Sequence, residues 1–176
     1  QNNAIAGPNA EARPHGQLLT QDNFLPLSVR GFGDPWNAYL HGMAWFENNL
    51  YCGTFRANFA FLKVRKIGRP TWERWPIECP PGSPLETLDC SAQIWRLNPQ
   101  TAQWSNVYRA PVVTGKHGKP IAREVAYRGM VVFKGKSDPK PVLYATPFCT
   151  TQSPGPQFLR SEDGVTFDTC SKPGLG

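Results

Sequence analysis

The hydrophobic residues of the chain occur in short runs separated by turn residues. No window of helical length shows apolar positions at the spacing i, i+3, i+4 and i+7. Short apolar and aromatic runs bounded by Gly, Pro, Asn and Asp are instead typical of β-strands joined by tight turns. The sequence therefore predicts an all-β protein.

Two hairpin-like stretches resemble each other residue by residue. The first contains HGMAWF at 41–46 and LYCGTF at 50–55, and the second contains RGMVVF at 128–133 and LYATPF at 143–148. The Gly, Met and Phe of the first strand recur in the same order, and so do the Tyr and Phe of the second. Such ordered agreement indicates an internal repeat.

A second pair of matching segments follows each hairpin. The stretch QIWR at 93–96 matches QFLR at 157–160, and each leads through a polar turn into a strand that opens with an aromatic residue, Trp104 or Phe167. Each repeat is therefore predicted to form four antiparallel strands. The predicted strands are 41–47, 50–56, 92–97 and 103–109 in the first repeat, and 124–134, 141–148, 156–161 and 165–171 in the second.

One four-stranded sheet is too small to hide both of its faces from water. Copies stacked around an axis bury those faces, as in a β-propeller. The glycines at 42 and 129 fit such an arrangement, because a missing side chain lets inner strands approach closely near the axis. We therefore predict a β-propeller fragment of two four-stranded antiparallel blades.

The stretch 24–33 resembles the end of the second repeat, 167–176, with Phe at the start and Gly-x-Gly at the end of both. It is interpreted as an outer strand that belongs to a further blade. Because two blades cannot close a ring, we expect partners: further propeller blades from another chain, or a homo-oligomer. The predicted organisation is an N-terminal extension at 1–23, the orphan outer strand at 24–33, a first blade at 34–112 with an insertion at 57–91, and a second blade at 113–176.

Charge and composition exclude several classes of protein. The net charge is +6, but the basic residues are scattered and no nucleic-acid-binding signature is present, so we expect no nucleic-acid partner. An anionic ligand is compatible with this charge. No apolar run reaches membrane-spanning length, and no signal peptide is visible at the start, so we expect no membrane span and leave the compartment open.

The five cysteines lack metal-ligand spacing, and no histidine lies near enough in sequence to complete a zinc site. No P-loop or HExxH motif is present either, so neither a metal nor a cofactor is expected. Cys79 and Cys90 flank a proline-rich loop and could form a disulfide. Reduced, buried thiols are equally compatible with the sequence.

Two outer hairpins resemble motifs of known propeller families. The turn SEDGVTF at 161–167 resembles the Asp-box hairpin of sialidase-like propellers, shortened by one residue, and the stretch 94–104 resembles the outer hairpin of kelch-like propellers. This resemblance implies an architecture rather than an activity. In Asp-box propellers the motif is peripheral, so the resemblance implies that Asp163 closes a turn.

Candidate site residues are those that repeat symmetry places near the axis, together with two tryptophans of the insertion. Loops on a rigid scaffold commonly carry binding residues, and tryptophans suit sugar or protein contacts. The ligand-binding candidates are Asn37, Tyr39, His41, Arg56, Trp72, Trp75 and Arg128, and the catalytic candidates are His41, Glu124 and Arg128. We predict a propeller-type recognition module that binds a carbohydrate or a protein partner. The alternative is part of a propeller enzyme, a hydrolase or lyase acting on glycans, so whether the chain is an enzyme stays open.

Overall fold

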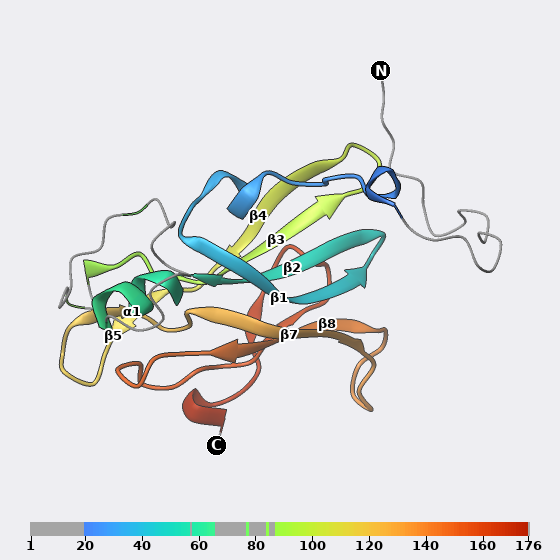
Figure 1. Cartoon of the computed structure of the whole chain (residues 1–176). Helices are drawn as coiled ribbons and strands as arrows, with labels where there is room; N and C mark the ends of the chain where they lie inside the picture. Colours follow the sequence, from blue (N-terminus) through green and yellow to red (C-terminus); the bar gives the residue numbers. More distant parts are fainter. Residues whose placement is uncertain (1–19, 57, 66–76, 78–83, 85–86, 176) are drawn as a thin grey trace.

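The chain folds into antiparallel strands that form one curled sheet, a half-barrel (Figure 1). The structure is a computed structural model that describes residues 20–56, 58–65, 77, 84 and 87–175. A separate two-stranded hairpin lies outside the eight-stranded sheet. The all-β fold predicted from the sequence is confirmed.

The large sheet consists of two antiparallel meanders. The N-terminal meander contains β1 (Asn37–Phe46), β2 (Asn49–Arg56), β3 (Gln93–Asn98) and β4 (Gln103–Arg109), paired in chain order. The C-terminal meander contains β7 (Ala126–Phe133), β8 (Val142–Phe148), β9 (Leu159–Ser161) and β10 (Asp168–Thr169), also paired in chain order. One pair, Phe55 with Ala126, joins β2 to β7. A strand is therefore present at each of the eight predicted positions.

The outer strands of the C-terminal meander are shorter than predicted. The predicted strands 156–161 and 165–171 contract to three and two residues in β9 and β10. The backbone nitrogens of Gln157 and Phe158 donate to the side chains of Glu124 and Ser171, so the β9 ladder begins only at Leu159. Consequently this meander consists chiefly of β7 and β8.

Three kinds of element were not predicted. The insertion holds a short helix, α1 (Asn58–Arg65), whose eight residues are too few to show helical periodicity. The hairpin of β5 (Val112–Thr114) and β6 (Pro120–Ala122) connects the meanders. Short 3₁₀ turns occur at Gln21–Asn23, Arg30–Gly33 and Pro173–Leu175. No helix among the described residues is long and apolar enough to cross a membrane.

The two inner hairpins share an irregularity at the same position of the repeat. The β1–β2 ladder shifts register at His41, just before Gly42. The β7–β8 ladder shifts register at Arg128, just before Gly129. A bulge re-aims the side chains around it, so the alignment of His41 with Arg128 has a structural counterpart.

Glycines allow the two meanders to approach each other closely. A Cβ atom at Gly42 would lie 2.8 Å from the carbonyl carbon of Gly129, and one at Gly53 would lie 2.5 Å from the carbonyl oxygen of Tyr127. Real Cβ atoms do not come so near to backbone. The close approach expected at Gly42 is therefore confirmed, and Gly53 adds a second such position.

Replacing Gly53 with alanine is expected to lower the free energy of unfolding by about 2 kcal/mol, because the new methyl group must push the backbone at Tyr127 away. Urea denaturation would measure the loss. Gly118→Ala is the comparison: a Cβ there meets no atom within 4 Å, so only its positive φ of 72° is costly. A loss at Gly53 no larger than that at Gly118 would contradict the close approach.

The hydrophobic core lies between the meanders. Phe46, Tyr51 and Ile94 of the N-terminal meander pack against Tyr127 and Leu143 of the C-terminal one. A second cluster, which includes Phe55, Ala60 of α1 and Val125, lies beside the helix. The first cluster therefore holds the meanders together, and the second anchors the insertion.

The stretch 24–33, predicted as an orphan outer strand, forms no ladder with any strand in the described part of the chain. It lies against the N-terminal meander instead. The indole Nε1 of Trp104 donates a hydrogen bond of 2.7 Å to the carbonyl oxygen of Leu27, and the ring of Phe32 stacks on Trp95 at 4.6 Å. The stretch thus covers the outer part of one face of this meander.

Candidate functional site

Three of the predicted ligand-binding residues lie together on the surface where β1 and β7 meet. The rings of Tyr39 and His41 are 5.1 Å apart, and both side chains are exposed. Arg128 is also exposed, and its charge acts on both of these side chains. The structure therefore brings Tyr39, His41 and Arg128 to one place.

Two phenylalanines complete this group. The Phe55 ring lies 5.2 Å from Tyr39 and 5.7 Å from Phe148, and the guanidinium carbon of Arg128 lies 5.2 Å from the centre of the Phe148 ring. We call Tyr39, His41, Phe55, Arg128 and Phe148 the aromatic cluster. Its two phenylalanines were not predicted as site residues, although they occupy equivalent positions in the repeat.

The electrostatics of the aromatic cluster favour an anion. Partial desolvation lowers the pKa of His41, and the positive charge of Arg128 lowers it further, so the imidazole is neutral at pH 7. Desolvation raises the pKa of Tyr39, so its hydroxyl is protonated and can donate. No carboxylate among the described residues pairs with Arg128, which leaves its guanidinium free to bind one.

Asn37 and Arg56, also predicted as ligand-binding residues, are buried inside the N-terminal meander. Arg56 is fully buried, and its guanidinium donates to Asp34 at 2.6 Å, to Asn37 at 2.9 Å and to Asp89 at 2.7 Å. The Asn37 amide donates to Gln93 at 3.1 Å. The side chains of Asn37 and Arg56 are therefore engaged with each other and with Asp34, Asp89 and Gln93 inside the protein, and they are not exposed to a ligand.

Glu124, a catalytic candidate, is fully buried as well. One of its carboxylate oxygens accepts from the Arg123 guanidinium at 2.6 Å and from the backbone nitrogen of Gln157 at 3.1 Å. Its other oxygen accepts from the Tyr127 hydroxyl at 3.2 Å. The carboxylate thus has internal partners on both oxygens, and it does not extend to the aromatic cluster.

The remaining candidates, Trp72 and Trp75, lie outside the described residues, so their predicted contact with a sugar or a partner stays a prediction. Cys79 lies outside them too, which leaves the suggested bridge to Cys90 a prediction. Cys52, Cys149 and Cys170 are free thiols. Burial raises the pKa of the Cys52 thiol to about 12, so this thiol is unreactive.

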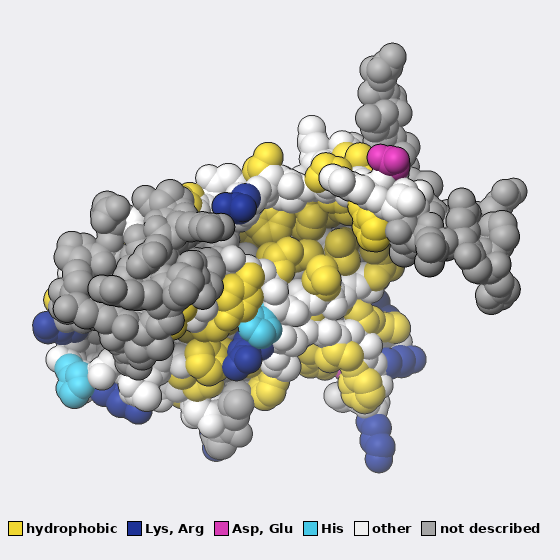
Figure 2. Space-filling view, viewed as in Figure 1, with side chains coloured by type: hydrophobic (Ala, Val, Ile, Leu, Met, Phe, Trp, Pro, Cys, Tyr) yellow, Lys and Arg dark blue, Asp and Glu magenta, His cyan; other side chains and the backbone are white. Residues whose placement is uncertain are grey.

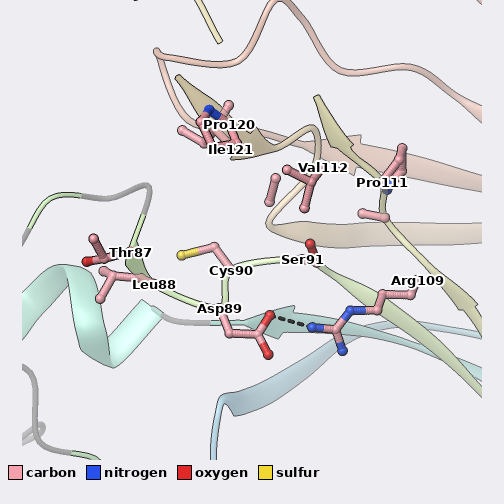
Figure 3. A pocket seen from close by; sticks show the side chains of 12 residues that line it. Thr87, Leu88, Asp89, Cys90, Ser91, Arg109, Pro111, Val112, Pro120 and Ile121 are labelled. Atoms are coloured by element: carbon pink, nitrogen blue, oxygen red, sulfur yellow. Dashed lines mark hydrogen bonds and ion pairs between the residues drawn. The ribbon is translucent and has the colours of Figure 1, made fainter. Parts of the chain in front are cut away.

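A cavity of about 590 Å³ that sequence analysis missed opens where the insertion meets the end of β4 (Figure 3). An ion pair between Asp89 and Arg109 lies at its wall. The same Asp89 carboxylate also holds the buried Arg56. The two charged groups in the lining are therefore paired with each other. The residues that line the cavity are Thr87 to Ser91, Arg109 to Val112 and Pro120 to Ala122.

Asp163 closes the turn between β9 and β10, the structural role that its Asp-box-like sequence implied. Its carboxylate accepts from the backbone nitrogens of Thr166 at 2.7 Å and Val165 at 2.8 Å, and from the Ser161 hydroxyl at 3.2 Å. The backbone hydrogen bonds from Thr166 and Val165 lower the pKa of Asp163 to about 2. The Asp163 carboxylate therefore stabilises this turn.

Comparison with known proteins assigns no family to the chain. No protein-family model matches the sequence, no curated protein matches it significantly, and no solved structure matches the fold. Within the described residues, no group of three or more His, Cys, Asp or Glu side chains could hold a metal ion. The geometry of the aromatic cluster is therefore the best indication of function.

Proposed function

We propose that the chain is a propeller-type recognition module whose aromatic cluster binds a carbohydrate that carries a carboxylate. The observation that carries the proposal is Arg128, an exposed arginine over an aromatic ring that no described carboxylate neutralises. Arginine binds carboxylates through two parallel hydrogen bonds. A sugar acid bound there would place its carboxylate on Arg128 and its ring over Tyr39 and Phe148.

The other groups of the cluster suit the same ligand. Tyr39 and Phe148 are partly exposed, so their apolar faces are available to the C–H groups of a sugar ring. The protonated Tyr39 hydroxyl and the neutral His41 imidazole can both donate and accept hydrogen bonds with sugar hydroxyls. The cluster thus combines an apolar surface, two neutral polar groups and one cation.

The propeller part of the proposal rests on the repeat. Both meanders consist of four antiparallel strands, and both carry a bulge just before the glycine at which β1 and β7 meet. We propose that each meander is a blade and that the bulges lie near the axis. His41 and Arg128 would then occupy equivalent axial positions, where propellers present ligand-binding residues.

We propose binding rather than turnover. Glycan hydrolysis commonly needs two carboxylates at the bond that is cleaved. The carboxyl candidate of the predicted enzyme alternative, Glu124, is buried and bonded to Arg123, and the charged group that shifts the pKa of His41 is Arg128. The cluster therefore supports recognition better than acid–base chemistry.

Isothermal titration with a glucuronic acid oligosaccharide and with the matched glucose oligosaccharide tests this function. We expect the acidic ligand to bind more tightly, and Arg128→Gln to weaken its binding about 10- to 100-fold, because a charge-assisted hydrogen bond is lost. Tyr39→Ala should weaken the binding of both oligosaccharides, since it removes an aromatic surface that both sugar rings would contact.

Lys134→Gln is the matched control. It removes the same charge from an exposed residue just beyond the other end of β7, so it should leave the affinity unchanged. Circular dichroism would verify that each variant is folded. The proposal would be overturned by equal affinities for the two sugars, or by a loss of affinity in Lys134→Gln as large as that in Arg128→Gln.

A further inference from the structure

The interface between the two meanders shows what kind of surface covers one face of each meander. In the C-terminal meander, Tyr127, Met130 and Val132 face the core and pack against the N-terminal meander. The opposing surface contains Phe46 and Tyr51 of the N-terminal meander. The meanders have two different faces, and in this interface the face with Tyr127 on the C-terminal meander packs against the face with Phe46 on the N-terminal meander.

The repeat places an uncovered copy of the first surface on the N-terminal meander. Aligning Gly42 with Gly129 and Leu50 with Leu143 matches the pairing registers of both hairpins. By this alignment the positions equivalent to Tyr127, Met130 and Val132 are Leu40, Met43 and Trp45. Tyr127 is fully buried, whereas Leu40, Met43 and Trp45 are 40%, 60% and 48% exposed. We call Leu40, Met43 and Trp45 the open N-terminal face.

The C-terminal meander carries an uncovered copy of part of the opposing surface, since Tyr144, the equivalent of Tyr51, is half-buried and its hydroxyl donates to Asp138. The position equivalent to Phe46, which is 4% exposed, is Phe133, which is 58% exposed. The neighbouring Val131 is also exposed, whereas its equivalent, Ala44, packs on the core. We call Val131 and Phe133 the open C-terminal face. A single chain therefore exposes part of each half of the interface that it forms internally.

We infer that these two open faces bind each other between copies of the chain, head to tail. The open C-terminal face of one copy would cover the open N-terminal face of the next, as the N-terminal meander covers the C-terminal one within the chain. An interface of this kind joins different surfaces of the two copies, so it builds a ring or an open chain of protomers. Isolated exposed apolar residues are common, but two apolar faces that match the halves of an existing interface indicate an interaction surface.

The stretch 24–33 leaves room for this contact. It covers the outer part of the same side of the N-terminal meander, where Phe32 lies on Trp95 and Trp104. Between this stretch and β1 lies an apolar groove of about 280 Å³, where Figure 2 shows hydrophobic side chains gathered in a hollow. The outer strands β9 and β10 of the incoming copy are very short, so β7 and β8 would make the contact beside the stretch.

This inference deepens the proposed propeller architecture, because it supplies a neighbour for each of the two open faces. It is independent of the carbohydrate proposal. A chain that stayed monomeric could still bind an acidic sugar at Arg128, and an assembling chain could fail to bind one. The two experiments therefore separate the two proposals.

Analytical ultracentrifugation over a range of protein concentrations tests the inference. We expect the chain to assemble, and we expect Met43→Asp and Phe133→Asp each to raise the dissociation constant at least about 100-fold, because a carboxylate would be buried without a partner. Both residues are exposed within one chain, so both variants should keep the circular dichroism spectrum. Val165→Asp is the control, since it changes an equally exposed apolar residue outside the open faces.

A mixture of the two variants gives the sharpest result. Met43→Asp retains a functional open C-terminal face, and Phe133→Asp retains a functional open N-terminal face, so an equimolar mixture should form a one-to-one dimer and stop there. A chain that is monomeric at every concentration would overturn the inference, as would assembly that survives either change. Failure of the mixture to dimerise would overturn the head-to-tail arrangement, and a monomer that instead binds a different protein through Met43 would show that another chain covers this face.

Discussion

A variant in which Asp34 and Asp89 are both changed to asparagine is expected to lose about 3–5 kcal/mol of its free energy of unfolding. The reason is the burial of Arg56. Its side chain is fully buried, and the two carboxylates lie 2.6 and 2.7 Å from its guanidinium nitrogens. Asparagine keeps the shape and one acceptor oxygen at each position but removes both negative charges. The guanidinium would then be an uncompensated charge in the interior, which is costly.

Removing the arginine itself should cost less. The carboxylates of Asp34 and Asp89 are 31% and 42% exposed, so water can solvate them when Arg56 is replaced by methionine. Adding Arg56→Met to the double asparagine variant should therefore restore part of the lost stability. A triple variant that is more stable than the double variant would indicate that the cost comes from an unpaired buried charge rather than from lost packing.

Urea denaturation monitored by tryptophan fluorescence would measure these differences. A matched control changes two exposed aspartates, Asp22 and Asp168, to asparagine and should alter the free energy of unfolding by less than about 1 kcal/mol in total. If the double variant of Asp34 and Asp89 were no less stable than this control, the burial of Arg56 would not depend on its two carboxylates.

The sequence predicted the strands well because the fold depends on local patterns that repeat. Positions such as Met43 and Phe46 recur as Met130 and Phe133, so one hairpin supports the interpretation of the other. The helix at 58–65 has no such counterpart and is too short to show a period. Its position follows from contacts such as Ala60 with the second apolar cluster, and local sequence does not encode those contacts.

The candidate site was predicted only in part, because register shifts in β1 change which side chains share a face. In a regular strand Asn37, Tyr39 and His41 share one face, because side chains alternate. The β1–β2 ladder shifts register between Asn37 and Tyr39 and again before Gly42. Asn37 therefore turns inward to Arg56, while Tyr39 and His41 stay at the surface. Alignment of repeats identified His41 and Arg128 as equivalent, but it could not show that Glu124, just before β7, points into the interior.

The proposed sugar site and the proposed assembly faces lie on the same two strands, β1 and β7. His41 and Arg128 lie at the bulges of β1 and β7, while Met43 and Phe133 lie further along the same strands. If copies assemble head to tail, the surface that carries the aromatic cluster would be repeated in every copy. Several weak sugar sites presented together bind a polymeric ligand far more tightly than one site does.

Changing Glu124 to glutamine is expected to lower the free energy of unfolding by about 3 kcal/mol and to leave sugar binding by the folded chain unchanged. The carboxylate is fully buried and bonded to Arg123, whose side chain is only 12% exposed, so the change leaves an inadequately paired cation in the interior. Because glutamine keeps the shape of the side chain, the loss of stability would measure the effect of the missing charge. Urea denaturation and titration with the acidic oligosaccharide would measure the two effects separately.

Glu162→Gln is the control, because this glutamate pairs with Arg160 at the surface, where an ion pair contributes less than about 1 kcal/mol. The opposite pattern at Glu124, unchanged stability with loss of an activity on glycans, would identify it as an acid or base and favour the enzyme alternative. The buried pair with Arg123 and the hydrogen bond from Tyr127 argue for the structural role. A carboxylate whose two oxygens already accept three internal hydrogen bonds has its function inside the fold, where it fixes the start of β7 and thereby the position of Arg128 four residues later.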